Sequence, residues 1–217
     1  TRLSRGALLK DLCQAAGRTF ASPCVTLNGE KCRLQLCERP VYALQKGVAC
    51  HCCGSSVLSG DSSGTFLDGQ GREIAVISDG MGTGARAAVD GAMAAGVLET
   101  LVKAGVGFRC AMQIVNSTLL CKSEEETLAT LDIAIIDLFS GHVEWIKAGA
   151  PPGFVCRGNR AREIEASSLP LGILPQVQSA RQSCDLSLGD VLMLVSDGAT
   201  VAGTGWICEL LEKERQK

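Results

Sequence analysis

Three acidic residues lie in turns where carboxylates could act together. Asp79 and Asp197 each occur in a Ser-Asp-Gly sequence that ends an apolar run, residues 74–77 and 191–195, and Asp61 lies in a Ser-Gly-Asp-Ser turn. Two carboxylates a few ångströms apart are unstable unless a proton or a cation lies between them. The chain has two His, neither near a Ser-Asp-Gly motif, so the composition favours a hard divalent cation bound by oxygen ligands.

The apolar runs predict the elements that would position two of these carboxylates. Short runs of Val, Ile, Leu and Met indicate buried strands. The Gly after each Asp permits a sharp turn and leaves its carbonyl free to face what the Asp faces. We therefore predict two central strands, each presenting one carboxylate at the end of a sheet. The alternative is that both motifs are Asx turns that only terminate strands.

The acidic cluster also predicts a reaction class. Carboxylates from separate turns, with water completing the ligand shell, suit Mg²⁺ or Mn²⁺. Two such ions about 3.5–4 Å apart would clamp a phosphate and lower the pKa of a bridging water. The expected chemistry is metal-assisted phosphoester hydrolysis, with Asp61, Asp79 and Asp197 as the catalytic carboxylates.

Other chemistries fit the residues less well. Gly80, Gly82 and Ala85 match a dinucleotide-binding GxGxxA loop, but the carboxylate of Asp79 at its mouth would repel a pyrophosphate. No P-loop sequence occurs, and Ser62 lacks the His and glycine-run context of a serine hydrolase. A zinc site at residues 50–53, Cys-His-Cys-Cys, lacks a second well-spaced Cys/His pair, so ordinary strand residues are expected there.

Composition limits the class of protein. The chain has 217 residues, 46% of them hydrophobic, enough for one domain with a short appendage. Its net charge is -2 and it has no basic stripe, so no nucleic-acid partner is expected. No apolar stretch approaches the roughly 18–20 residues that span a bilayer, and the scattered Cys favour a reducing compartment. We expect a soluble, cytoplasmic domain.

The order of predicted elements gives the fold class. A helix over residues 3–16 stops at Gly17, and Asn28-Gly29 predicts a hairpin. A strand is expected at residues 41–52. The remaining predictions are helices at 85–103 and 108–122, strands at 127–139, 143–148, 154–157, 162–165, 177–184 and 191–195, and a helix from 206. This order is typical of an α+β fold with largely antiparallel sheets.

Five segments carry a resemblance to a known family. They are residues 59–62 (SGDS), 77–87 (ISDGMGTGARA), 130–138 (TLDIAIIDL), 169–173 (LPLGI) and 195–198 (VSDG). Together they resemble the PPM-type metal-dependent Ser/Thr protein phosphatases, and within these the stage II sporulation protein E family of endospore-forming bacteria. The resemblance runs from about residue 41 to 198 in the family's order.

The resemblance implies a fold, a site and a substrate. The fold is a sandwich of two antiparallel β-sheets flanked by helices, residues 39–217, preceded by a helix and regulatory linker, residues 1–38. Asp79 would bridge two manganese or magnesium ions, the Gly80 carbonyl and Asp61 (mainly through water) would bind the first, and Asp197 the second. The implied substrate is phosphoserine on an anti-anti-sigma factor, whose dephosphorylation frees a sporulation sigma factor.

Further implications concern partners and location. Residues 85–122 resemble a regulatory switch that couples partner or homodimer contacts to metal occupancy. The parent protein is implied to have a membrane anchor, and a contact with a cell-division protein, through an N-terminal part that precedes this chain. Two rival interpretations are a catalytically weak scaffold that binds a partner through residues 85–122, and a PPM phosphatase of the general stress response.

The chain departs from the family pattern at two places. Met81 stands where many members have a His that donates a proton to the leaving group, so a metal-bound water would have to donate. The family also ends in a helix and a strand with a further metal-binding Asp, whereas this sequence stops at Lys217, inside the last predicted helix. We therefore expect this fragment to bind metal poorly and to turn over slowly.

Three other polar residues allow two interpretations each. Arg86 could reach a phosphate or a partner, or be a solvated helix residue. Asp132 could support the site from within an apolar strand, or lie on its exposed face. Lys147 could flank the site, but a surface position is the simpler expectation.

Overall fold

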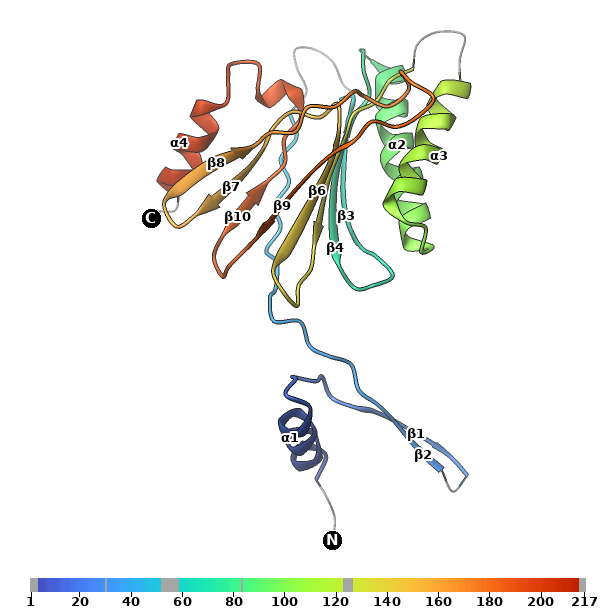
Figure 1. Ribbon diagram of the computed structural model, residues 1–217, viewed down its shortest axis with the longest axis vertical. Helices are drawn as coiled ribbons and strands as arrows, with labels where there is room; N and C mark the ends of the chain where they lie inside the picture. The colour runs from blue at the N-terminus through green and yellow to red at the C-terminus, as the bar shows by residue number, and fades with distance from the viewer. Residues whose placement is uncertain (1–3, 30, 52–58, 83, 123–126, 215–217) are drawn as a thin grey trace. The chain divides into compact units, whose positions relative to one another are not determined.

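The computed structural model describes residues 4–29, 31–51, 59–82, 84–122 and 127–214. The chain divides into two compact units, residues 1–44 and 45–217. Figure 1 shows the elements of both units and labels most of them.

The described residues of the smaller unit form a helix and a hairpin. Helix α1 (Arg5–Ala16) begins after Ser4, whose hydroxyl caps the first turn by accepting a hydrogen bond from the Ala7 N–H. It ends at Gly17, whose φ of 63° is the left-handed conformation that favours Gly. Strands β1 (Cys24–Asn28) and β2 (Lys31–Gln35) pair antiparallel. The predicted helix, its end at Gly17 and the predicted hairpin are confirmed.

The larger unit is built on a five-stranded antiparallel sheet of order β3-β4-β5-β6-β9. Its strands are β3 (Asp61–Leu67), β4 (Glu73–Asp79), β5 (Leu131–Ile136), β6 (His142–Ala148) and β9 (Ala180–Asp185). Strand β4, which ends in the first Ser-Asp-Gly motif, lies inside the sheet between β3 and β5, as predicted.

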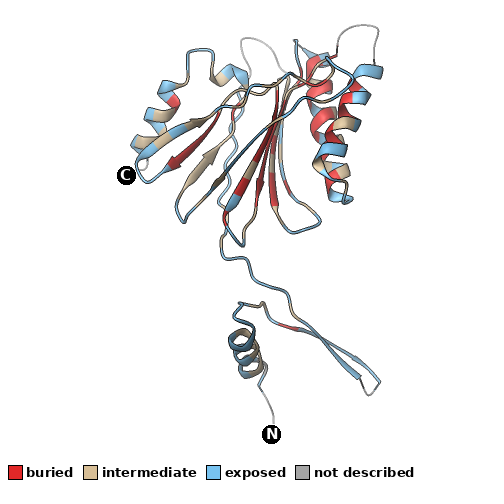
Figure 2. Ribbon diagram, in the orientation of Figure 1, coloured by how far each residue is buried: buried red, intermediate tan, exposed pale blue. Residues whose placement is uncertain are grey.

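Two helices cover one face of this sheet. They are α2 (Ala85–Lys103) and α3 (Phe108–Cys121), which Figure 1 shows side by side. Side chains of β4 and β5 that pack against them alternate with side chains that face away, so Ile74, Val76, Leu131 and Ile133 join the helices in one core. In Figure 2 the buried residues concentrate in these strands and in the two helices. Across the described part of the chain, no helix has the length and apolar character needed to cross a membrane.

A second sheet completes the sandwich. It has three antiparallel strands in the order β10-β7-β8. These are β7 (Gly153–Arg157), β8 (Arg160–Ile164) and β10 (Val191–Met193), and α4 (Gly205–Glu214) packs on this sheet. Phe154, Val195 and Ile207 form the core between them. The predicted α+β sandwich of two antiparallel sheets with flanking helices is confirmed.

Two predicted strands are wrong in extent or position. The run at 191–195 was expected to be a central strand reaching Ser-Asp-Gly, but β10 ends at Met193 and is an edge strand among the described residues. Asp197 instead opens a 3₁₀ turn, η1 (Asp197–Ala199). Residues 41–51 form no strand, because within the described ranges no other strand pairs with them, and Val41 and Val48 are exposed. Cys52 and Cys53 of the possible zinc cluster lie outside the described residues.

The core makes one clear stability prediction. Leu98 of α2 is fully buried, whereas Leu188 is 91% exposed. Leu98→Ala should therefore lower the free energy of unfolding by about 2–5 kcal/mol, because it removes buried methyl groups and leaves a cavity. Leu188→Ala should change it by less than about 0.5 kcal/mol. Urea unfolding followed by circular dichroism measures both, and equal effects of the two changes would contradict this packing.

Candidate metal centre

Strand pairing places two of the predicted carboxylates opposite each other. Asp61 is the first residue of β3 and Asp79 the last of β4, and the antiparallel register pairs them directly. Residues directly opposite on neighbouring strands have Cβ atoms about 4.5–5.5 Å apart. The turn predicted at Asp61 is therefore the beginning of a strand, and its carboxylate is fixed by the ladder.

The third carboxylate arrives from the other sheet. Asp197 follows β10 by four residues, and the preceding Ser196 donates a hydrogen bond from Oγ to Asp61 Oδ2 at 2.9 Å. This contact joins the segment after the three-stranded sheet to the edge of the five-stranded sheet. Sequence reasoning did not select Ser196, although the Ser repeated in both Ser-Asp-Gly motifs was a usable signal.

The electrostatics of Asp79 show that all three carboxylates interact. Burial, the charges of Asp61 and Asp197, and hydrogen bonds with both raise the pKa of Asp79 from 3.8 to about 7. Asp79 is half-buried, and Asp197 is exposed. The structure thus brings together the acidic residues that the sequence singled out, although Asp79 and Asp197 are 118 positions apart in the sequence.

The backbone around Asp79 is held from two sides. Its N–H donates to Thr130 Oγ1 at 3.1 Å, and its carbonyl accepts from the Thr130 N–H at 2.8 Å. A Cβ on Gly60 would lie 3.0 Å from the Gly80 carbonyl oxygen and 3.1 Å from Asp79 Oδ1. Both oxygens therefore face the same small region, beside Asp61.

Glycines allow α2 to approach these turns. A Cβ on Gly80 would lie 1.9 Å from the Ala87 carbonyl oxygen, and a Cβ on Gly91 would lie 2.3 Å from the Gly60 carbonyl oxygen. Backbone therefore packs on backbone between α2 and both acidic turns. A side chain at either glycine would force the helix and the turns apart.

The donor set suits a hard cation with an incomplete protein shell. Within the ranges that the structure describes, no three His, Cys, Asp or Glu side chains gather closely enough to hold a metal ion by themselves. The raised pKa of Asp79 nevertheless shows that its two acidic neighbours lie within interaction range. The two observations are compatible, because Mg²⁺ and similar ions take one or two carboxylates and keep several waters. The residues present therefore fit the implied ions.

The charge cluster predicts how stability depends on pH. Asp79, with a native pKa of about 7 against the usual 3.8, keeps a proton in the folded state that the unfolded state has lost. The stability of the metal-free protein should therefore fall as pH rises from about 4 to about 7. Asp132, with a pKa raised by burial to about 6, acts in the same direction. Urea unfolding in EDTA at several pH values tests this. Stability that rises between pH 5 and 7.5 would contradict it.

The other polar residues differ in how far they are buried. Arg86 is exposed, and its Nη2 donates to Thr127 Oγ1 at 3.4 Å. Asp132 and Lys147 are both fully buried, so the expectation of a surface position for Lys147 is wrong, as is the exposed interpretation of Asp132. The periodicity of β5 and β6 could not predict the burial of these two residues, since a charged residue on a buried face looks the same in sequence as one on an exposed face.

Comparison with known proteins assigns the family. The sequence profile described as stage II sporulation protein E (SpoIIE) matches residues 69–215. The chain belongs to the SpoIIE family. The match includes both Ser-Asp-Gly motifs and the two helices α2 and α3.

Individual relatives agree with this assignment. Stage II sporulation protein E of Bacillus subtilis is 35% identical over 157 residues, which are 72% of this chain and 19% of that protein. The protein of the same name from Priestia megaterium is 33% identical over 157 residues, which are 72% of this chain and 27% of that protein. The chain thus spans about a fifth of the length of the B. subtilis relative.

A solved structure extends the similarity to almost all of the chain. It contains the PP2C phosphatase domain and a fragment of the regulatory domain of SpoIIE from B. subtilis, with a TM-score of 0.75 and 25% identity. It covers 99% of this chain, and the alignment includes 71% of the solved chain. The fold is that of the PP2C phosphatases, and the SpoIIE family is a family of PPM/PP2C-type serine phosphatases.

Proposed function

We propose that this SpoIIE-family chain is a metal-dependent serine/threonine phosphatase that hydrolyses phosphoserine on an anti-anti-sigma factor and so activates a sporulation sigma factor. The observation that carries the proposal is the convergence of Asp61, Asp79 and Asp197 from two sheets, which raises the pKa of Asp79 to about 7. Such a concentration of negative charge is suited to binding cations.

The proposed metal ligands are those that the resemblance to the PPM-type phosphatases implies. Asp79 and Asp61, with the Gly80 carbonyl and Asp197, would hold Mn²⁺ or Mg²⁺ in this proposal, with Asp79 shared between two ions, Gly80 and Asp61 (mainly through water) on the first and Asp197 on the second. When bound, divalent cations supply positive charge to the phosphate and lower the pKa of coordinated water. Ser196 orients Asp61, and Thr130 fixes the backbone of Asp79.

Proton supply is also proposed from the residues present. Met81, after Asp79 and Gly80, is exposed, and its side chain carries no proton that it could donate. Water at the open side of the site is therefore the proposed source of the proton for the leaving hydroxyl of the substrate.

The organisation of the whole protein is part of the proposal. Residues 1–38 are assigned to a regulatory segment and 39–217 to the phosphatase domain, in line with the two domain types present in the solved relative. We also propose a cytoplasmic position for this domain, a membrane anchor and a cell-division protein contact elsewhere in the parent protein, and homodimer or partner contacts through α2 and α3.

Phosphate release tests the function. Incubation with a phosphorylated anti-anti-sigma protein and Mn²⁺ should release inorganic phosphate, and EDTA should prevent this. Binding of the partner without release would favour the scaffold interpretation instead. Release from a stress-pathway substrate but not from the sporulation substrate would favour the stress-response interpretation.

Metal titration tests the expectation of weak binding. Calorimetry with Mn²⁺ should show weak uptake, because within the described ranges no three acidic, His or Cys side chains gather closely enough to hold a metal ion by themselves. Two tight sites would contradict that expectation while leaving the phosphatase proposal in place.

A further inference from the structure

A buried ion pair lies in the larger unit, outside the acidic turns. Asp132 of β5 and Lys147 of β6 are directly paired across the sheet, with Lys147 Nζ 2.6 Å from Asp132 Oδ2. The side chain of Lys147 is 0% exposed and that of Asp132 is 1% exposed. Because desolvation of both charges opposes their attraction, an apolar pair of similar volume would often be as stable or more so. Stability alone therefore does not account for these residues.

The surroundings of the pair are poorly arranged for stability. Asp132 Oδ1 and Trp145 Nε1 are buried and have no hydrogen-bond partner in the part of the chain that the structure describes. A buried polar atom without a hydrogen-bond partner destabilises the folded state. Burial raises the pKa of Asp132 to about 6 although the neighbouring Lys147 lowers it. The pair is thus an energetic cost that another role would have to justify.

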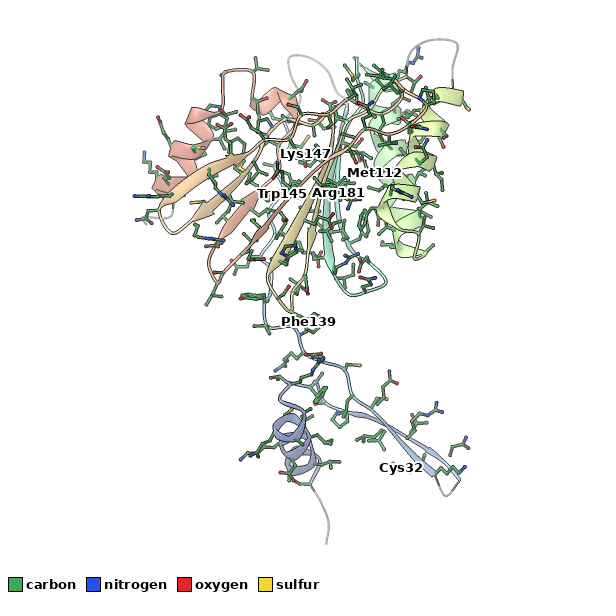
Figure 3. The ribbon with its side chains drawn as sticks, viewed as in Figure 1. Cys32, Met112, Phe139, Trp145, Lys147 and Arg181 are labelled. Carbon is green, nitrogen blue, oxygen red and sulfur yellow. The ribbon has the colours of Figure 1, made fainter. Side chains whose placement is uncertain are left out.

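The pair faces the second sheet. Leu131 and Ile133, on either side of Asp132, pack against the helices, so the Asp132 side chain points to the opposite face of β5. At the beginning of β7, a Cβ on Gly153 would lie 3.6 Å from Lys147 Nζ and 3.6 Å from Trp145 Nε1. Lys147 and Trp145, both labelled in Figure 3, lie in this region between the sheets.

A second hydrogen bond connects Lys147 to the crossover between the sheets, residues 149–152, which joins β6 to β7. Its Nζ donates to the Pro151 carbonyl at 2.7 Å. Pro151 and Pro152 have no N–H, so this crossover offers acceptors. A Lys ammonium, with three donors and no acceptor, can hold both a carboxylate and a carbonyl.

The crossover is connected to the segment that carries Asp197 through the pairing of two strands. Strand β7 follows it and pairs with β10, with Phe154 opposite Met193. A Cβ on Gly153 would lie 3.3 Å from the Met193 carbonyl oxygen. One ammonium therefore connects β5 and β6, next to the strand that ends at Asp79, with the strands that lead to Asp197.

We propose that Lys147 is a positioning residue for the acidic site: held by Asp132 and the Pro151 carbonyl, it sets the separation between the sheet that carries Asp61 and Asp79 and the sheet that leads to Asp197. This inference rests on the proposed function, because that separation matters only if the three carboxylates share cations. The two hydrogen bonds of Lys147 Nζ are directional, so they fix the separation of the two sheets. An apolar pair of the same volume would fill the space without fixing that separation.

The test replaces the pair without leaving a charge unpaired. The double variant Asp132→Leu/Lys147→Met should remain folded, with an unfolding free energy near that of the wild type. Its Mn²⁺ affinity by calorimetry should fall at least about tenfold, and amide hydrogen exchange of residues 195–200 in the metal-free protein should accelerate by a similar factor. Wild-type affinity together with unchanged exchange would overturn the proposal.

Two further variants keep the result interpretable. If the double variant does not fold, Asp132→Asn/Lys147→Gln, a neutral polar pair too short to reach Pro151, is measured in the same way with the same deciding outcomes. Asp68→Asn is the control. It breaks an ion pair with Arg72 just after Leu67, the last residue of β3, whereas Asp61 is the first residue of that strand. It should lower stability and leave Mn²⁺ affinity and exchange at residues 195–200 unchanged.

The inference and the proposed function can fail separately. A wild-type protein that neither binds Mn²⁺ nor releases phosphate would overturn the function. The hydrogen exchange of residues 195–200, measured without metal, would still show whether Lys147 holds the two sheets in place.

Discussion

Replacing Asp79 by Asn should abolish Mn²⁺-dependent phosphate release and, at the same time, stabilise the metal-free protein. Asp79 is the carboxylate on which the charges of Asp61 and Asp197 both act. Without it, cations lose the ligand proposed to bridge them, and the charge stabilisation they provide is worth several kcal/mol in the transition state. A loss of at least about 10²–10³-fold in rate follows.

The same substitution lowers activity but raises stability, and the reason for the gain in stability is electrostatic. Above pH 7 the wild type must hold Asp79 ionised beside two other carboxylates, whereas the amide that replaces this carboxylate in the variant is neutral at any pH. The pKa shift from 3.8 to about 7 would correspond to about 4 kcal/mol if it were undiminished. Asp79 is half-buried, so solvent screening reduces this to about 1–2 kcal/mol.

Thermal unfolding with and without Mn²⁺ separates the two effects. In EDTA at pH 7.5 the variant should melt above the wild type, and added Mn²⁺ should stabilise the wild type but not the variant. Asp137→Asn is the control, because hydrogen bonds from Ser140 and Phe139 lower the pKa of that carboxyl. It should destabilise slightly and leave turnover intact. An Asp79→Asn protein with wild-type turnover would contradict the assigned site.

Two glycines of α2 should respond in opposite directions to the same substitution. In Gly91→Ala the new Cβ would lie 2.3 Å from the Gly60 carbonyl oxygen and 3.0 Å from the Gly80 nitrogen, so backbone must move. We expect a loss of about 3 kcal/mol or more in unfolding free energy, well beyond the helix-propensity gain of about 1 kcal/mol. Mn²⁺ affinity should fall as well, because both acidic turns are displaced.

Gly96→Ala is the matched control within the same helix. Gly96 is exposed, and a Cβ there would meet nothing within 4 Å. The change should stabilise the protein by about 0.5–1 kcal/mol, because Ala has the higher helix propensity, and leave metal affinity unchanged. Chemical denaturation and calorimetry on the two variants give both numbers. Similar stability effects from the two changes would show that α2 does not pack on the turns through Gly91.

Much of the fold was predictable because local signals determine local elements. The apolar periodicity of α2 and α3, the Gly17 stop and the Asn28-Gly29 turn depend on residues near each other in sequence, and all were predicted correctly. Strand β4 was also correct, because the continuous apolar run at residues 74–77, just before Ser78 and Asp79, indicates a strand inside a sheet. The strand predicted over residues 41–52 was wrong for the described residues 41–51, since their imperfect alternation resembles a strand but no described strand pairs with them.

The sequence by itself singled out the residues that we propose carry the chemistry: three acidic residues, two of them after apolar runs, and the glycines beside them. Only the tertiary structure decided how they meet. Asp79 is opposite Asp61 through strand register, whereas Asp197 arrives from a different sheet, through a 3₁₀ turn and the Ser196 hydrogen bond. The burial of Lys147 against Asp132 was likewise decided by tertiary packing. The physical reason is that pairing and stacking of sheets join residues far apart in the chain, and no local periodicity encodes which partner a strand or a charge will find.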